Sequence, residues 1–170
     1  MNGDPRYQID RGNRIFTLVA PGGQNDMDEF MRAAFEEAKL GLKEGGIPIG
    51  AVLVKDGIVI GKGHNRRVQD GNPIMHAEID CLRDTGRIFT YGGTILYSTL
   101  VPCYLCAGAV VQFGIKKVIV GESRSFPGAT EFMTSHGVEV IDLDDAECIE
   151  MMRKFILKNP ELWNEDIGAL

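Results

Sequence analysis

Cysteine is scarce in this chain, and long apolar runs are absent. Four cysteines in 170 residues are too few for a scaffold built from disulfides. No stretch approaches the roughly 20 apolar residues that a membrane helix needs, and the apolar run at residues 15–20 is shorter than the core of a signal peptide. We therefore expect a cytoplasmic protein with no membrane partner, whose cysteines stay reduced and available to a metal.

Basic residues are also few. Lysine and arginine total 18 against 24 aspartates and glutamates, which gives a net charge of −6. The basic residues form no long run. Affinity for nucleic acid depends on basic side chains that displace counterions from phosphates, so the composition predicts no nucleic-acid partner.

The length of the chain suits one domain better than two. Residues 1–25 show no clear apolar period and contain the turn-forming sequence PGGQN, so we interpret them as an N-terminal extension ahead of a single domain at 26–170. That domain should begin with a helix at 27–43, because its apolar residues recur every three or four positions. Asp26, with Glu29 three residues later, fits the cap of this helix.

Short runs rich in valine and isoleucine predict one sheet. We expect five strands, at 51–54, 58–61, 94–99, 117–121 and 138–142. Lys55-Asp56-Gly57 is a hairpin signal, so the first two strands should pair antiparallel. The last two strands are joined by the 16 residues 122–137, with a short helical stretch from Ala129. A crossover of that length favours a parallel pair.

Helices should connect the strands. A short helix is expected around 76–83, and another should run to about Phe113. Pro102 should lie in the first turn of the second one, because a helix start does not use the N–H that proline lacks.

The end of the chain predicts a further helix and a tail. Asp144 or Asp145 can cap this helix, which should end near Leu157, and Pro160 separates it from the tail ELWNEDIGAL. The expected fold class is α/β: a three-layer α/β/α sandwich around a mixed five-stranded sheet, with an antiparallel first hairpin and parallel later strands.

Two short motifs carry the chemistry. MHAEID supplies His76 and Glu78, and VPCYLC supplies Cys103 and Cys106. Zinc binds histidine nitrogen and cysteine sulfur tetrahedrally, and three protein ligands leave a fourth position open for water, which marks a catalytic site. The combination H-x-E…P-C-x-x-C is the signature of zinc-dependent nucleobase deaminases.

This pattern assigns different roles to the carboxylate and the sulfurs. Glu78 is two residues from a ligand, so it can move protons beside an activated water without binding the metal. Both cysteines should lie at a helix start, where the thiolate is favoured. A redox CxxC pair and a structural zinc site remain alternatives. The first has no use for His76, and the second lacks a fourth ligand, because Cys81 and Cys148 are poorly placed.

The motifs HAEI, PCYLC, GGIPIGAVLV and GKGHN resemble the cytidine deaminase-like superfamily. The tail KNPELWNEDIG resembles the C-terminal end of the yeast-type (fungal) cytosine deaminases, which act on the free base. The resemblance covers residues 27–170. This sequence departs from the yeast-type pattern at Ala77, where that branch has glycine, and at Val101, where it has a small polar residue.

The resemblance implies the following site. One Zn²⁺ per chain would be bound by His76, Cys103 and Cys106, with Glu78 as the catalytic proton shuttle. Residues 160–170 would form a lid, and similar enzymes are homodimers with sites near the interface. The groups implied to contact the base are Asn65, the backbone N–H of Ala77, Asp166, Phe126, Trp163 and Ile167. Asn65 would meet the polar edge of the ring, and Asp166 would accept a hydrogen bond from the leaving amino group.

The expected function is hydrolytic deamination of cytosine to uracil and ammonia, a step of pyrimidine salvage. Alternatives are a deaminase of another small amino heterocycle, such as isocytosine, creatinine or guanine, or of a nucleoside. A transfer-RNA adenosine deaminase shares the HAE and PCxxC motifs but needs an electropositive approach to its site. A zinc-stabilised interaction domain would have no need of Glu78.

Overall fold

The computed structural model describes residues 27–169 and the backbone of two short strands before them. These strands, β1 (Tyr7–Ile9) and β2 (Ile15–Thr17), pair antiparallel with each other, which the sequence did not predict. The rest of the expected extension lies outside the described residues, and so does Asp26.

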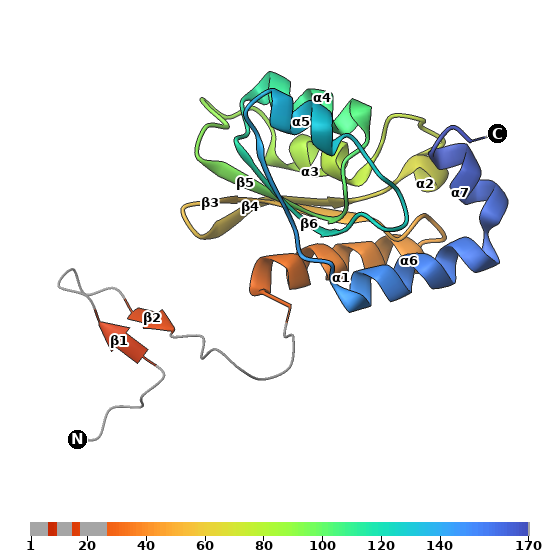
Figure 1. Cartoon of the computed structure of the whole chain (residues 1–170), viewed down its shortest axis with the longest axis horizontal. Coiled ribbons are helices and arrows are strands. Elements are labelled where there is room, and N and C mark those ends of the chain that lie inside the picture. The colour runs from red at the N-terminus through yellow and green to blue at the C-terminus, as the bar shows by residue number, and fades with distance from the viewer. Residues whose placement is uncertain (1–6, 10–14, 18–26, 170) are drawn as a thin grey trace.

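A mixed five-stranded sheet forms the centre of the domain (Figure 1). Its strands are β3 (Gly50–Lys55), β4 (Ile58–His64), β5 (Thr94–Leu100), β6 (Lys117–Glu122) and β7 (Glu139–Asp142). They lie in the order β4-β3-β5-β6-β7, with β3 antiparallel to both its neighbours and β5, β6 and β7 parallel. The predicted strand number and directions are confirmed.

The hairpin between β3 and β4 turns at two residues with positive φ. Asp56 has φ 51° and Gly57 has φ 74°, which is the conformation that a two-residue hairpin turn of the primed kind requires. Aspartate and glycine are among the residues that enter this region most readily, so the local sequence accounts for the turn.

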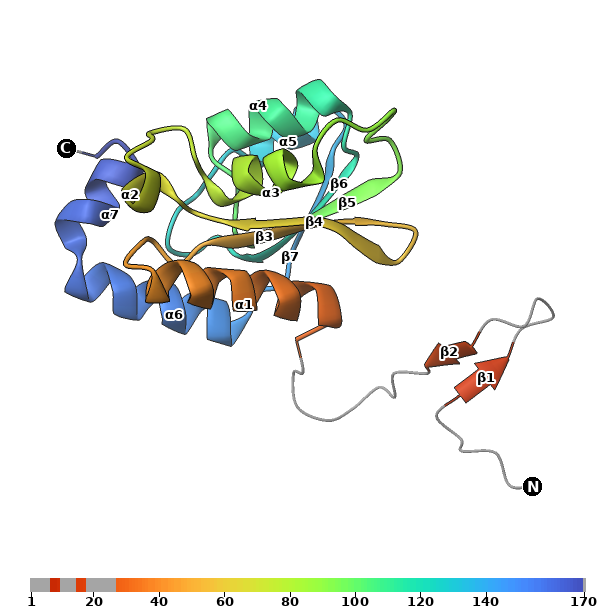
Figure 2. The same cartoon turned by 180° about the vertical axis from the view of Figure 1, so that it is seen from behind.

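Helices cover both faces of the sheet, as predicted (Figures 1 and 2). One face carries α1 (Glu29–Lys43) and α6 (Ala146–Lys158), and the other carries α3 (Ala77–Thr85), α4 (Tyr104–Phe113) and α5 (Thr130–Ser135). Two short helices that the sequence did not predict, α2 (Arg67–Asp70) and α7 (Pro160–Asp166), lie together at one end of the sheet. Among the described residues, no helix has the length and apolar character to cross a membrane.

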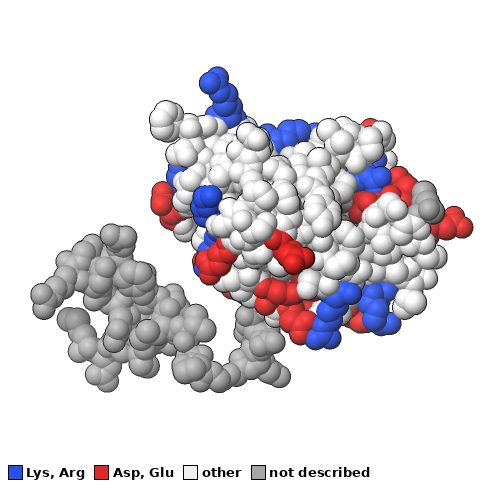
Figure 3. Space-filling view, turned by 45° about the horizontal axis from the view of Figure 1, so that its top comes forward, with Lys and Arg blue, Asp and Glu red and all other residues white. Residues whose placement is uncertain are grey.

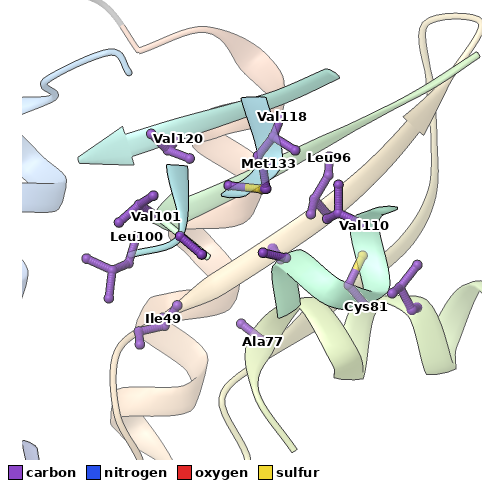
Figure 4. Close-up of a cluster of buried hydrophobic side chains, with 14 of the residues drawn as sticks. Ile49, Ala77, Cys81, Leu96, Leu100, Val101, Val110, Val118, Val120 and Met133 are labelled. Carbon is purple, nitrogen blue, oxygen red and sulfur yellow. The ribbon is translucent and has the colours of Figure 1, made fainter. Parts of the chain in front are cut away.

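Side chains of the central strands alternate between two apolar clusters. In β3, Ala51 and Leu53 face α3 and α4, whereas Val52 and Val54 face α1. Figure 4 shows the first cluster, in which side chains of the sheet meet Ala77 of α3 and other residues from the helices. This alternation follows from the two-residue period of a strand, and it explains why the strands read as continuous apolar runs.

Helix starts differ in detail from the prediction. Asp28 caps α1, two residues after the predicted position, because its carboxylate accepts from the backbone N–H groups of Phe30 and Met31. Asp145 caps α6. Pro160 ends α6 as predicted, but it also begins α7, where its missing N–H has no helical partner.

The prediction that Pro102 lies in the first turn of α4 was wrong. Cys103 is the N-cap of this helix, and Tyr104 is its first residue. Val101 still donates to the Glu122 carbonyl at 3.0 Å, continuing the pairing of β5 with β6. Proline has no N–H, so Pro102 ends this pairing instead of starting the helix.

Close packing of α1 on the sheet depends on Gly50. A Cβ at this position would lie inside van der Waals contact with the backbone of Ala34 and Ala38. We expect Gly50→Ala to lower the free energy of unfolding by about 1–3 kcal/mol, measured by urea denaturation. Gly108→Ala in α4 is the matched control, because nothing lies within 4 Å of the place that its Cβ would take, and it should not destabilise the fold. Equal effects of both changes would contradict this packing.

Candidate active site

The three predicted metal ligands come together where two helices begin. His76 is the N-cap of α3 and Cys103 is the N-cap of α4, and Cys106 lies in the first turn of α4. The Nδ1 atom of His76 is 3.5 Å from the Sγ atom of Cys103, and the ligand atoms of all three residues lie within 4.8 Å of one another. The structure therefore confirms that the two sequence motifs form one cluster.

Local sequence explains why the helices begin at these residues. His76 and Cys103 both have extended backbones, with φ −72° and ψ 163° and 176° respectively, as N-cap residues commonly do. Each is followed closely by a small residue that is fully buried, Ala77 in α3 and Ala107 in α4. These small side chains allow both helix starts to pack against the sheet.

The cluster fits a zinc ion. One imidazole nitrogen and two sulfurs are ligands that zinc prefers, and three protein ligands leave one of four tetrahedral positions open. Within residues 27–169, no second group of three such side chains occurs. Cys81 and Cys148 are instead buried in the two apolar clusters, where burial raises the pKa of each thiol. A fourth cysteine ligand, which a structural site would need, is not supplied by either residue.

The two sulfurs of the cluster differ in their tendency to ionise. A hydrogen bond from Cys106 lowers the pKa of Cys103 to about 4, against the opposing effect of burial. The same hydrogen bond, together with burial, raises the pKa of the Cys106 thiol. The expectation that both thiolates are favoured thus fails for Cys106, and for Cys103 the main cause is the hydrogen bond from Cys106. A bound divalent cation would displace the remaining proton, because metal ligation requires the thiolate.

Glu78 lies in the first turn of α3, beside the cluster. Its side chain is almost fully buried, and its Oε1 atom accepts a hydrogen bond of 3.0 Å from the Ser98 hydroxyl. Burial, followed by the nearby Cys103, raises the pKa of the Glu78 carboxyl. A carboxyl group whose pKa is raised accepts a proton more readily than a carboxyl group in water, as a proton shuttle requires.

Ser98 is a site residue that the sequence did not predict. It lies in β5, within the run TILYSTL, and it is fully buried. A small polar residue at an inward position of an apolar strand was the available signal, because a buried hydroxyl needs a partner.

A cavity of about 250 Å³ opens onto the cluster. Most of the predicted site residues line it, namely Asn65, His76, Ala77, Glu78, Cys103, Phe126, Asp166 and Ile167. Cys106 and Trp163 are not among the lining residues. Trp163 is buried behind the wall, with its ring edge-on to Phe126 at a centroid distance of 6.4 Å. The cavity is smaller than the pockets that hold drug-sized ligands, which suits a single small ring.

The C-terminal helix meets the cavity through a network of charged and polar groups. Asp166 of α7 accepts from the Asn65 amide at 3.3 Å and from the Arg67 guanidinium at 2.6 Å. A second nitrogen of Arg67 donates to Glu165 at 2.8 Å. Arg67 lies in α2, and no pattern in the sequence singles it out.

Comparison with known proteins identifies the family. The family model for the cytidine and deoxycytidylate deaminase zinc-binding region matches residues 24–122. The chain belongs to this deaminase family. The matched region includes every residue of the metal cluster and Glu78, so the deaminase family accounts for the two motifs and for the choice of zinc.

Individual deaminases share most of the chain. Cytosine deaminase from Candida albicans is 43% identical over 141 residues, which cover 81% of this chain and 94% of that protein. The tRNA-specific adenosine deaminase from Bacillus subtilis is 40% identical over 138 residues, covering 74% and 86% of the two chains. A solved structure of a tRNA:A34 deaminase has a TM-score of 0.64 at 32% identity, and the match covers 72% of this chain and 97% of that one.

Metal content tests the ligand set. We expect the purified protein to hold about one zinc per chain, measured by atomic absorption. Cys106→Ser should lose most of that zinc, because a hydroxyl is a poor replacement for a thiolate. Cys148→Ala is the control: this cysteine is buried among apolar side chains, so its variant should keep the metal. Full zinc occupancy in Cys106→Ser would contradict the assignment.

Proposed function

We propose that this protein is a cytosine deaminase, which hydrolyses the free base cytosine to uracil and ammonia in pyrimidine salvage. The observation that carries the proposal is the small cavity at the metal cluster, bounded on one side by the C-terminal residues Asp166 and Ile167. The likeness to the Candida albicans cytosine deaminase, which extends over 94% of that protein, supports this choice of substrate.

The proposed reaction divides the chemistry between the metal and Glu78. His76, Cys103 and Cys106 would hold the zinc ion, which when bound lowers the pKa of a water and so supplies a nucleophile at neutral pH. Glu78 would take a proton from this attacking water and pass it to the ring nitrogen. It would then take the second proton, from the hydroxyl group now on the ring carbon, and give it to the amino group that leaves as ammonia. The C–N bond to the amino group breaks and a C–O bond forms in its place.

Asn65 and Ala77 are proposed to hold the ring. The Asn65 oxygen accepts from the backbone N–H of Arg67 at 3.1 Å, and one amide hydrogen is directed at Asp166. A second amide hydrogen remains for the carbonyl group of the base. Ala77 is the first residue of α3, where a backbone N–H has no intrahelical partner. Both groups would therefore act as donors.

We also propose that residues 26–170 form one deaminase domain, with 1–25 as an extension and 160–170 as a lid. In this arrangement Asp166 accepts from the amino group of cytosine, and Phe126, Trp163 and Ile167 supply the apolar wall. Trp163 supports Phe126 from behind. Closure of such a lid over the base would exclude water from the reacting atoms.

A homodimer and a cytoplasmic location belong to the same proposal. The middle of the face seen in Figure 3, which includes α4 and α5, is mostly uncharged, with charged side chains around its edge. Tyr104, Leu105 and Phe113 of α4 are exposed large apolar residues, and the first two also line the cavity. Covering this face with a second copy would bury them close to the active site.

A transfer-RNA adenosine deaminase is the second candidate, because such enzymes are similar to this chain over most of its length. Two features favour the free base. The net charge of −6 opposes binding of a polyanion, and Asp166 and Ile167 occupy one side of the cavity where a flipped nucleotide would need room for its ribose and phosphates. Absence of a nucleic-acid partner therefore stays a prediction.

Glu78→Gln tests the proton shuttle. We expect this variant to keep its zinc and fold but to lose about 10²- to 10⁴-fold in kcat, because an amide cannot exchange the proton. Activity is measured as ammonia release. Glu150→Gln, at an exposed ion pair on α6, should retain full activity. Undiminished turnover by Glu78→Gln would remove this residue from the mechanism.

A panel of amino heterocycles tests the substrate. Cytosine should be deaminated with a kcat/KM about two orders of magnitude or more above that of cytidine, because a cavity of about 250 Å³ leaves little room for ribose. Isocytosine, creatinine, guanine and a transfer-RNA anticodon stem-loop complete the panel. Comparable rates with cytosine and cytidine would exclude the closed lid, and brisk turnover of the stem-loop alone would favour the second candidate.

A further inference from the structure

Arg67 joins three segments of the chain at the edge of the cavity. Its guanidinium donates to Asp166 at 2.6 Å, to Glu165 at 2.8 Å and to the carbonyl of Pro73 at 3.2 Å. Glu165 and Asp166 belong to α7, whereas Arg67 lies in α2, directly after the loop that carries Asn65. Figures 1 and 2 show these two helices side by side at the end of the sheet.

The inner half of this network is sheltered from water. The side chains of Arg67 and Asp166 are 10% and 6% exposed, whereas Glu165 is 50% exposed. Ion pairs on the open surface, such as Arg124 with Asp144, contribute little because solvent screens them. Breaking a buried pair has a larger effect, because the remaining charge loses its partner in a poorly solvated place.

We propose that Arg67 is a positioning residue that latches α7 over the cavity and fixes the carboxylate of Asp166 for the substrate. This inference rests on the proposed function. Arg67 and Asn65 both donate to the Oδ1 atom of Asp166, which leaves Oδ2 for a donor within the cavity. The carboxylate therefore takes its binding orientation only when α7 is docked against α2.

The latch couples the docking of α7 to the orientation of two groups that would bind the base, Asp166 and Asn65. When α7 moves away, Asp166 loses Arg67 and Asn65 together, so the base loses one direct contact and Asn65 loses the partner that orients its amide. Apolar packing of Trp163 and Ile167 with the core holds α7 near its docked place without fixing the carboxylate. Loss of Arg67 should thus loosen the tail and weaken substrate binding without unfolding the domain.

The single tryptophan of the chain makes docking measurable without a substrate. Trp163 lies in α7 and is 5% exposed, so acrylamide should quench its fluorescence weakly in the native protein. Arg67→Met, which removes the charge and keeps much of the apolar stem, should increase the quenching constant about twofold or more. Arg32→Met is the matched control, since it breaks an exposed ion pair with Glu147 at the start of α6, the end of that helix opposite to α7, and it should leave quenching unchanged.

Kinetics form the second arm of the experiment. Arg67→Met should lower kcat/KM for cytosine about tenfold or more, mainly through a higher KM, with zinc content unchanged. Arg67→Lys should recover part of the loss, because an ammonium replaces the charge but not the two-pronged geometry. If Arg67 acts through Asp166, adding Arg67→Met to Asp166→Asn should change kcat/KM by less than about twofold.

The proposal requires that Arg67→Met both increase the quenching of Trp163 and lower kcat/KM. Native quenching of Trp163 in Arg67→Met would overturn the latch, and so would native kcat/KM or a full additional loss in the double variant. Should Arg67→Met not fold, Arg67→Lys is judged by the same two measurements. If the native protein does not turn over cytosine, the proposed function fails, whereas the quenching arm still decides whether Arg67 docks α7. The kinetic arm then uses the ring from the panel that releases ammonia.

Discussion

Two helix starts meet at one point, and the chemistry of the site depends on this convergence. His76 begins α3 and Cys103 begins α4, so the positive ends of two helix dipoles lie beside the same cavity. This arrangement favours negative charge on a sulfur. It also leaves backbone N–H groups without helical partners, which makes donors available for a substrate without any dedicated side chain.

The meeting of the two helix starts also brings together acidic groups, Glu78 and Cys103, whose negative charges repel. Glu78 is buried next to Cys103, and both burial and that neighbour raise the pKa of its carboxyl. A cation held by two sulfurs and an imidazole would offset this repulsion, and the Ser98 hydroxyl partly satisfies the carboxylate. A zinc site with no catalytic task would have no reason to keep a carboxylate in this position.

Sequence patterns predicted the features of the fold and site that depend on burial and on metal chemistry. The strand directions and the two-faced layers follow from apolar periods and loop lengths, and the ligand set follows from residue types that zinc requires at short spacings. The start of α1 shifted by two residues because Asp26 and Asp28 are both possible caps in the sequence. The start of α4 shifted because Pro102 ends the pairing of β5 with β6 instead of beginning the helix. Arg67 could not be predicted: its partner Asp166 is 99 positions away, and nothing local distinguishes it from other arginines.

The proposed latch explains why a lid would be held by charges rather than by apolar contact alone. A purely apolar lid loses its whole contact energy on opening, because the exposed surface gains little from water. Arg67 and Asp166 regain hydration when they separate, and this offsets much of their lost attraction. The closed state is then well defined in geometry and yet close in free energy to the open state. An enzyme that must admit a small base and release its product in every turnover needs both properties.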